Sequence, residues 1–398
     1  MVFSGLLLGW SIFRIPLVQI FDDWTPTAVS ITFTISMVSF CFGGFAGGRL
    51  IPKITSKYSL QIAAGLVLVG FELLFLLIDY EQPTRTIVLM WFAYGIFFGA
   101  GVGLAYNSVL SAITRWFPGR TGMISGILLL GFGVGGLVVG SVVDKLISIF
   151  DVETTFGITG AAIAIVYFAG SFFMKTPPEG MFLNIDTTED QKSIKKNKIA
   201  SKNYTLKEML KTPSFWIFEI WVIMMSGAGM VVINSAAVIA VTFGAPAVLG
   251  LIISIFNGIG RPIMGTLLDY IGRKNAMMIN CFIMLLGGLV LLLGNMSFNA
   301  ILIFIGIPLI GLAYGGSPTM IASVPNLFYG EKHYPINFGV VNFAVGAAAI
   351  VGPIISSKLQ EFADGDYATT FVMIMLMSIC AFFLNVLLSY FSQKSKLE

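Results

Sequence analysis

Charge is scarce in this 398-residue chain. Only 11% of its residues are Asp, Glu, Lys or Arg, whereas soluble domains contain about 25%. The hydrophobic fraction is 57% and the mean hydropathy is +0.90, so an ordinary soluble globule is excluded. The chain is therefore expected to be an all-α, polytopic membrane protein. A formal net charge of +3 offers no large basic surface, and we expect no nucleic-acid partner.

Histidine and cysteine are also rare. His333 is the single histidine, and Cys41, Cys281 and Cys380 lie far apart in apolar stretches. That spacing provides neither a disulfide framework nor a metal site. The sequence also lacks a Ser/His/Asp grouping and a phosphate-binding glycine loop. We therefore expect no enzyme, no cofactor and no metal.

Apolar runs long enough to cross a bilayer recur along the chain. A membrane helix needs about 20 such residues for a core of roughly 30 Å. Eleven complete spans are expected: 27–48, 59–79, 86–113, 122–143, 155–174, 214–243, 247–268, 276–295, 300–325, 335–357 and 367–392.

A twelfth span, at the start of the chain, is incomplete. Residues 1–13 are apolar, but they reach only about 20 Å before Arg14 and Pro16. We expect that the first half of helix 1 is missing and that an in-frame apolar stretch precedes Met1. A signal peptide is the alternative, but the segment lacks a basic n-region and a small-residue cleavage site.

Lysine and arginine gather on one side of the expected spans. Short cytoplasmic loops carry such an excess, so we expect a multi-pass protein of the cell inner (plasma) membrane with both termini and the central loop in the cytoplasm. Besides the segment 175–211, the cytoplasmic cations are Arg49, Lys53, Lys57, Arg115, Arg120, Arg273, Lys274, Lys332, Lys394 and Lys396.

A single long polar interval divides the chain. It covers 175–212 and separates six spans from six, which predicts an N-terminal bundle at 1–174, a cytoplasmic central loop at 175–212 and a C-terminal bundle at 213–398. Within the loop, residues 203–211 could form a short amphipathic surface helix. The loop carries no folded module that would signal to a partner.

The two halves resemble each other. The tetrapeptide Gly103–Tyr106 recurs as Gly311–Tyr314, and the loops at 48–57 and 265–274 also correspond. A same-direction duplication of six spans is the plan of one large transporter class, whose substrate site lies midway through the bilayer. The 44 glycines would let neighbouring helices approach closely.

Three charged residues lie inside the expected spans, and such residues are functional hypotheses by default. Arg261 offers a planar fork of donors that suits bidentate capture of a carboxylate. Asn257, four residues earlier, lies on the same helix face. Arg261 could instead snorkel or pair with a structural carboxylate. Glu219 is a candidate proton site or the counter-ion of Arg261 when the cavity is empty, and an interfacial carboxylate is the alternative. Glu72 is a weaker candidate.

Several motifs resemble known families. The segment 265–274, with Gly265, Asp269, Gly272, Arg273 and Lys274, resembles the loop signature of the major facilitator superfamily. More narrowly, four motifs are similar in order and spacing to the oxalate:formate antiporter family. They are Gly101–Tyr106, Arg115–Arg120, Thr212–Trp216 and Asn257–Pro262.

This resemblance implies a major facilitator fold of two six-helix bundles, with helix 1 truncated here at its N-terminus. It also implies a monomeric carrier of small organic anions that works by rocking its halves. The substrate-binding role of the family's helix 8 arginine transfers to Arg261, beside Asn257. The family's aromatic positions on helices 4 and 10 transfer to Tyr106 and Tyr314.

Other family positions depart from the antiporter pattern. Its helix 11 lysine aligns with Val345, and the neighbouring tryptophan aligns with Asn342, which we expect to shape the pocket. Two tyrosines align with Pro318 and Leu8, and Pro52 takes the acidic position of the first loop signature.

The missing second cation bears on the substrate. One buried cation cannot neutralise a dianion, so we expect a monocarboxylate of the lactate, pyruvate or formate type, moved by proton symport or anion exchange. The expected partners are thus a small carboxylate, a proton in the symport case, and the lipid bilayer. The alternatives are efflux of another small solute and a non-transporting carboxylate sensor.

Overall fold

The computed structural model describes residues 1–24, 26–117, 120–175, 177, 202–244, 252–363 and 366–394. Within these ranges the chain is helical and contains no strand, which confirms the expected all-α class. Most of the expected central loop, including its lysine-rich run, lies outside the described residues. So does the beginning of the span expected at 247–268.

The chain divides into two compact units. Of the described residues, unit 1 takes those within Met1–Trp116, Gly131–Glu179 and Phe338–Val340, and unit 2 takes those within Phe117–Leu130, Gly180–Asn337 and Val341–Glu398. The first ten residues of helix α5, Thr121–Ile149, therefore group with unit 2. The expected domain limits at 174 and 213 remain a prediction.

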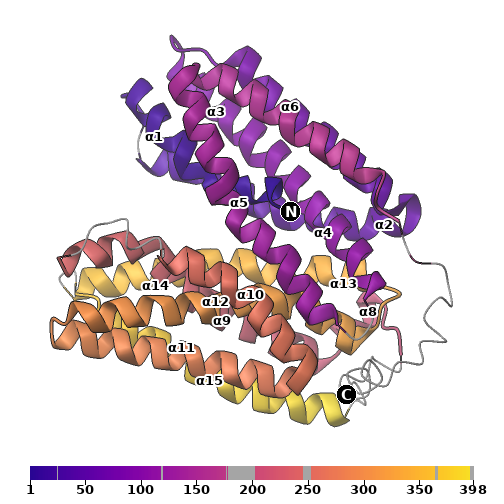
Figure 1. Ribbon diagram of the computed structural model, residues 1–398, viewed down its shortest axis with the longest axis vertical. Coiled ribbons are helices and arrows are strands. Elements are labelled where there is room, and N and C mark those ends of the chain that lie inside the picture. Colours follow the sequence, from indigo (N-terminus) through magenta and orange to yellow (C-terminus); the bar gives the residue numbers. More distant parts are fainter. Residues whose placement is uncertain are drawn as a thin grey trace. The chain divides into compact units, whose positions relative to one another are not determined.

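Unit 1 contains the helices of the N-terminal half (Figure 1). They are η1 (Phe3–Gly9), α1 (Trp10–Ile20), α2 (Pro26–Leu77), α3 (Pro83–Met90), the π-helix η2 (Trp91–Phe98), α4 (Gly99–Ile113), η3 (Thr114–Trp116), most of α5 and α6 (Val152–Ser171).

Helix α2 is two helices joined at a kink. Thr55 has φ 67° and ψ 159°, a conformation that β-branched residues rarely adopt. The kink falls between the two spans expected at 27–48 and 59–79. In contrast, α3, η2 and α4 follow one another without a break and together form the span expected at 86–113.

Unit 2 contains the helices of the C-terminal half. They are the short α8 (Leu206–Leu210), α9 (Pro213–Thr242), α10 (Ile252–Ile271), α11 (Arg273–Met296), α12 (Ala300–Tyr329), α13 (Tyr334–Val341), α14 (Phe343–Phe362) and α15 (Ala368–Lys394). Within α13, Phe338–Val340 group with unit 1. The span expected at 335–357 is interrupted at Asn342, where α13 gives way to α14.

Nine helices in the described part of the chain are long and apolar enough to cross a membrane. The number rises to ten if Phe3–Gly9 and Ile12–Ile20, which meet at 53°, form one broken span. This count takes α2 once although it holds two helices, and it omits α10, which carries Arg261 and Asp269. These two features account for part of the difference from the twelve spans expected.

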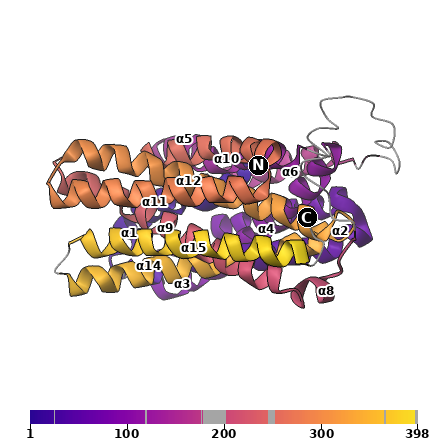
Figure 2. The same ribbon diagram turned by 90° about the horizontal axis from the view of Figure 1, so that it is seen from below.

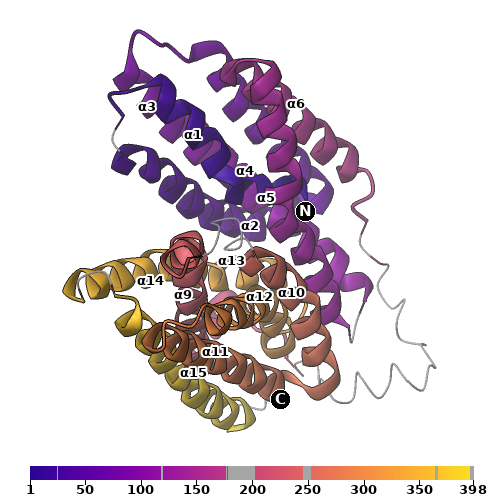
Figure 3. The same ribbon diagram turned by 60° about the vertical axis from the view of Figure 1, so that its left-hand side comes forward.

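The helices of unit 1 pack through glycine. Helix α2 packs against α4 and α6 (Figure 3). A Cβ added at Gly103 on α4 would overlap the carbonyl oxygen of Phe40 on α2, and a Cβ added at Gly43 on α2 would overlap that of Ala100 on α4. The backbones therefore meet at a distance that leaves no room for a side chain.

Unit 2 packs in a comparable way. Helix α12 contacts α10, α11 and α9, and α15 contacts α11 and α9. Figures 1 and 2 both show α11 and α15 running side by side. Helix α12 is long and contains Pro308, Pro318 and Pro325. Helices α9 and α10, which contribute residues to the candidate site described below, both pack against α12.

The close contact at Gly103 gives a stability prediction. In the Gly103→Ala variant, the added methyl group must displace the backbone of α2, and we expect a loss of about 1 to 3 kcal/mol. A lower thermal unfolding midpoint in detergent would show it. Gly65→Ala is the matched control, because no atom lies within 4 Å of a Cβ built at Gly65. Equal midpoints for the two variants would contradict this account of the packing.

Candidate functional site

Arg261 lies in the middle of α10. It is the tenth of the helix's 20 residues and only 3% exposed, so roughly 14 Å of helix separates it from either end. Asn257, one turn earlier, is also buried. The buried residues of α10 recur at helical spacing, which turns both polar side chains toward the interior of unit 2. A buried guanidinium is expensive in this setting and needs polar neighbours.

The polar neighbours described for Arg261 come from its own helix α10 and from α5 and α12. Its Nε donates to Oδ1 of Asn257 at 3.4 Å, a long bond for this geometry. Its Nη1 donates to the backbone carbonyl oxygen of Leu129 in the first part of α5. The carbonyl group of Arg261 itself accepts from the hydroxyl of Thr319 on α12, at 3.1 Å. The arginine is thus bound on its side chain and on its backbone.

Tyr314 on α12 is the aromatic neighbour of this arginine. Its phenol is close enough to Arg261 for their charges to interact, and its ring packs on Gly229 of α9, where a Cβ would overlap it. A Cβ added at Gly315 would overlap the carbonyl oxygen of Asn257. The small residues therefore let α9, α10 and α12 approach closely around Arg261.

The contacts described for the other two expected pocket residues, Tyr106 and Asn342, are with other parts of the chain. Tyr106 belongs to unit 1, where its ring stacks on Phe338 at 5.8 Å and meets Phe40 and Phe132 edge-on. Asn342 is buried at the break between α13 and α14, and its carbonyl accepts from the backbone of Val345 at 3.2 Å. Their place in a shared pocket remains a prediction.

Asp269, near the end of α10, binds the beginning of α5. Its Oδ1 accepts from the backbone N–H of Gly122 at 3.0 Å, and its Oδ2 accepts from that of Met123 at 2.7 Å. The first N–H groups of a helix have no partner within it and carry partial positive charge. Asp269 is therefore an N-terminal cap supplied by a distant helix. A close approach of Gly265 to Gly122 makes room for it.

Arg273 makes a separate set of contacts. It begins α11 after Gly272, whose φ is 82°, and it donates to Oδ1 of Asn385 and the hydroxyl of Ser389 on α15, both at 2.9 Å. Its guanidinium also lies over the ring of Phe328 on α12, 4.9 Å from the centroid. The loop motif therefore joins different pairs of helices through Asp269 and Arg273.

The two intramembrane glutamates are also placed. Glu219 lies on α9 as a half-buried residue, and its Oε1 is a buried atom without a hydrogen-bond partner among the described residues. Glu72 lies on α2 and is half-buried too. Sequence reasoning missed the carbonyl of Leu129, the capping role of Asp269 and the contacts of residues 203–212 described below. No local pattern marks any of them.

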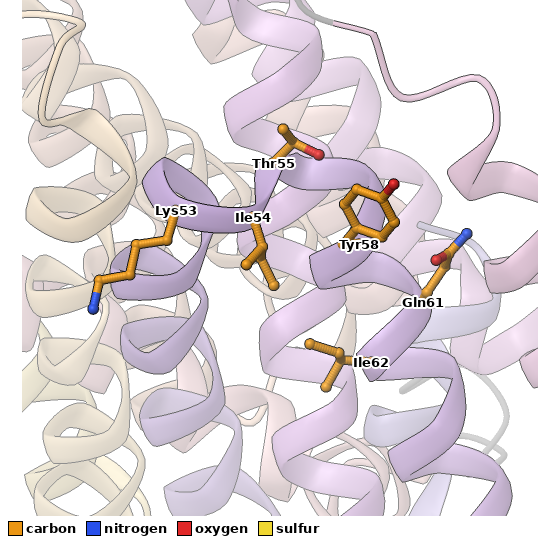
Figure 4. A pocket seen from close by; sticks show the side chains of 6 residues that line it. All are labelled: Lys53, Ile54, Thr55, Tyr58, Gln61 and Ile62. Carbon is orange, nitrogen blue, oxygen red and sulfur yellow. The ribbon is translucent and has the colours of Figure 1, made fainter.

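A surface hollow of ≈ 690 Å³ lies at the kink of α2. It is lined by Lys53, Ile54, Thr55, Tyr58, Gln61 and Ile62. Figure 4 shows Lys53 pointing away from Tyr58 and Gln61, so the polar groups do not converge as they do in a ligand site. The residues around Arg261 therefore remain the candidate site.

Comparisons with known proteins identify the superfamily of the chain. The model of the Major Facilitator Superfamily matches residues 1–353, and the chain belongs to this superfamily of membrane transporters. It is a multi-pass transporter of small solutes rather than an enzyme. The resemblance read from the loop motif at 265–274 is confirmed at this level.

Two relatives are similar over most of the chain. The oxalate:formate antiporter of Oxalobacter formigenes is 25% identical over 387 residues, covering 95% of this chain and 86% of the relative. The uncharacterized transporter YhjX of Escherichia coli (strain K12) is 28% identical over 332 residues, covering 79% of this chain and 77% of the relative. The solved structure of the proton:xylose symporter XylE gives a TM-score of 0.70 at 17% identity over 96% and 93% of the chains. This last likeness shows the fold alone.

The cap at the beginning of α5 gives a second prediction. Asp269→Ala leaves the N–H groups of Gly122 and Met123 without their acceptors, and we expect it to cost about 1 to 3 kcal/mol. The thermal unfolding midpoint of the purified protein would fall accordingly. Asp144→Ala, at an exposed position farther along α5, should leave the midpoint unchanged. A normal midpoint for Asp269→Ala would show that the cap adds nothing to stability.

Proposed function

We propose that this transporter carries a small monocarboxylate, of the lactate, pyruvate or formate type, by alternating access. The observation that supports the proposal best is the burial of Arg261 at the middle of α10, beside Asn257 and Tyr314. A guanidinium matches the two oxygens of a carboxylate with two parallel N–H donors. Such a bond is strong where water is excluded.

A carboxylate would exchange with the present partners of Arg261. The bond to Asn257 is long at 3.4 Å, and the bond to Leu129 ends on a neutral carbonyl. A carboxylate is a stronger acceptor than either oxygen, because it is charged. Asn257 would then donate its amide N–H to the substrate, and the Tyr314 hydroxyl would donate from α12. The antiporter relative, named for oxalate and formate, supports an organic anion as substrate.

The number of cations favours a monoanion over a dianion. The site brings one buried arginine to the substrate, and Val345 stands where the resemblance implies a lysine. A dianion would keep one uncompensated charge in a low-dielectric site, which is strongly unfavourable. A monoanion is neutralised by Arg261 alone. This difference separates the proposed specificity from that of an oxalate carrier.

The distribution of lysine and arginine supports one orientation. We place both termini and the central loop in the cytoplasm, with the protein in the plasma membrane as a monomer. In that orientation Asp269 and Arg273 lie toward the cytoplasmic ends of their helices. Arg261 lies near the middle of the bilayer, where transporters built from repeats hold their substrates.

The direct test removes the cation but keeps a polar side chain. In proteoliposomes, Arg261→Gln should reduce the uptake of labelled lactate, pyruvate and formate by a factor of about 100 or more, because a hydrogen-bonded charge pair is lost. Arg85→Gln is the matched control, since the Arg85 side chain is 61% exposed. If Arg261→Gln took up a monocarboxylate as well as the parent protein, the assigned site would be wrong.

A gain of charge tests the specificity. Val345→Lys supplies a second cation, and we expect the ratio of oxalate to lactate uptake to rise on the order of tenfold or more, which corresponds to about 1.4 kcal/mol. Val345→Met, which adds length without charge, is the control. An unchanged ratio in the lysine variant would contradict the argument from charge number.

A further inference from the structure

The last residues of the central loop fold back onto the end of α12. The backbone N–H of Tyr204 donates to the carbonyl of Tyr329 at 2.9 Å, and the carbonyl of Tyr204 accepts from the side chain of Asn337 at 3.0 Å. Oδ1 of Asn203 accepts from the backbone of Lys332 at 3.1 Å. We call the segment 202–212 the strap. It docks on protein and covers the end of unit 2 where α9 begins and α12 ends.

The strap is internally fixed. Thr205 and Glu208 form a reciprocal capping box at the start of α8, and Met209 is fully buried. Hydrogen bonds from Lys202 and Thr205 hold the pKa of Glu208 at about 2. The Glu208 carboxylate is therefore charged throughout the pH range of a transport assay. A pH effect between about 5 and 8 does not come from this cap.

Beneath the strap lies a line of hydroxyl groups. Tyr329 is fully buried, and its phenol oxygen lies 3.2 Å from the hydroxyl of Ser214 and 3.4 Å from that of Thr212. Thr212 is half-buried at the start of α9. Each hydroxyl can donate one hydrogen bond and accept another. All three hydroxyls lie where α9 begins and α12 ends.

Glu219 lies farther along α9 than these hydroxyls. It is six residues beyond Pro213 on α9, about 9 Å along the helix, and it is close enough to Tyr329 for its charge to act on the phenol hydroxyl. Its Oε1 is buried and has no hydrogen-bond partner in the described part of the chain. Ionising a carboxyl group is unfavourable when one of its oxygens is buried without a hydrogen-bond donor. Binding a proton removes the charge at this position.

Most titratable groups on the helices that pack against α9 are hydrogen-bonded to other residues, are exposed or lie near a helix end. Arg273 on α11 binds Asn385 and Ser389, and Cys281 accepts from the indole of Trp221. Asp269 on α10 caps α5, Arg261 binds Leu129 and Asn257, and Lys202 pairs with Glu208 in the strap. Tyr390 on α15 is exposed, and Lys358 and Glu361 lie near the far end of α14. Tyr329 is thus the titratable group that faces Glu219 from α12.

We propose that the carboxyl group of Glu219 is the proton-binding site of this transporter, and that the hydroxyls of Tyr329, Ser214 and Thr212 pass the proton between it and the end of α9. The inference rests on the proposed carboxylate transport, because it names the ion that accompanies the substrate. An O–H bond forms at one carboxylate oxygen of Glu219 when the proton binds and breaks when it leaves, and each hydroxyl of the line gives up one proton as it accepts another, so that all three stay neutral. No other group is oxidised, reduced or transferred.

Glu219 and Arg261 then bind the two transported ions separately. The substrate anion neutralises Arg261 on α10, and the proton neutralises Glu219 on α9. Both charges are removed from the interior of the protein only when anion and proton are bound together. The empty and the fully loaded protein carry the same net charge at these two residues, whereas a protein that holds only the anion or only the proton carries one unbalanced charge. Burying that unbalanced charge is unfavourable, and this difference couples the two fluxes.

The test separates proton-driven uptake from exchange. Proteoliposomes are assayed for lactate accumulation under an imposed pH gradient, and for exchange of internal for external lactate at equal pH. We expect Glu219→Gln to lose at least tenfold of the gradient-driven accumulation while exchange stays within about twofold of the parent. Glu72→Gln, the other half-buried intramembrane carboxylate, should retain both activities. Exchange also reports that each variant is folded.

Tyr329→Phe extends the test to the hydroxyl line. It removes one oxygen and should slow gradient-driven accumulation about tenfold, with exchange again preserved. If Glu219→Gln accumulated lactate with the parent's pH dependence, the proposal would be overturned. It would equally be overturned if the parent showed no response to a pH gradient. In both cases loss of exchange in Arg261→Gln would still support the proposed carboxylate site.

Discussion

The burial of a permanent positive charge is the constraint on which this structure depends. Arginine keeps its proton at any physiological pH, so the helices around Arg261 must supply acceptors from their own polar atoms. They do so with the amide oxygen of Asn257 and the backbone carbonyl of Leu129. Both of these acceptors are neutral, and a carboxylate is a stronger acceptor than either. The Arg261 side chain is therefore both the main constraint on the packing around it and the proposed substrate ligand.

Close helix packing makes that arrangement possible. A Cβ at Gly126 on α5 would overlap the carbonyl oxygen of Arg261, and one at Gly315 on α12 would overlap that of Asn257. Only glycine lets three backbones come so near to the arginine. The same contacts bring the beginning of α5 to Asp269. The glycines that reduce helix propensity are therefore the residues that place polar backbone groups inside the bundle.

Much of the fold could be predicted from hydropathy, since most expected spans correspond to helices within a few residues. The pairing of Arg261 with Asn257 was also predictable, because residues four apart share a helix face. The carbonyl of Leu129 was not, because it comes from a helix 132 residues away and carries no sequence signal. Residues 203–211 suggested a membrane-surface helix, but the short α8 lies within a strap held by Tyr329 and Asn337. Amphipathicity alone does not distinguish lipid from protein as the covering surface.

The central claim is that Arg261 binds a monocarboxylate, and equilibrium binding tests it without reference to coupling or flux. Labelled lactate is bound to the purified protein in detergent and displaced by formate, pyruvate or oxalate. The account predicts saturable binding that monocarboxylates displace more effectively than oxalate, and its loss in Arg261→Gln at an unchanged thermal unfolding midpoint. Undiminished lactate binding by the folded Arg261→Gln protein would contradict it.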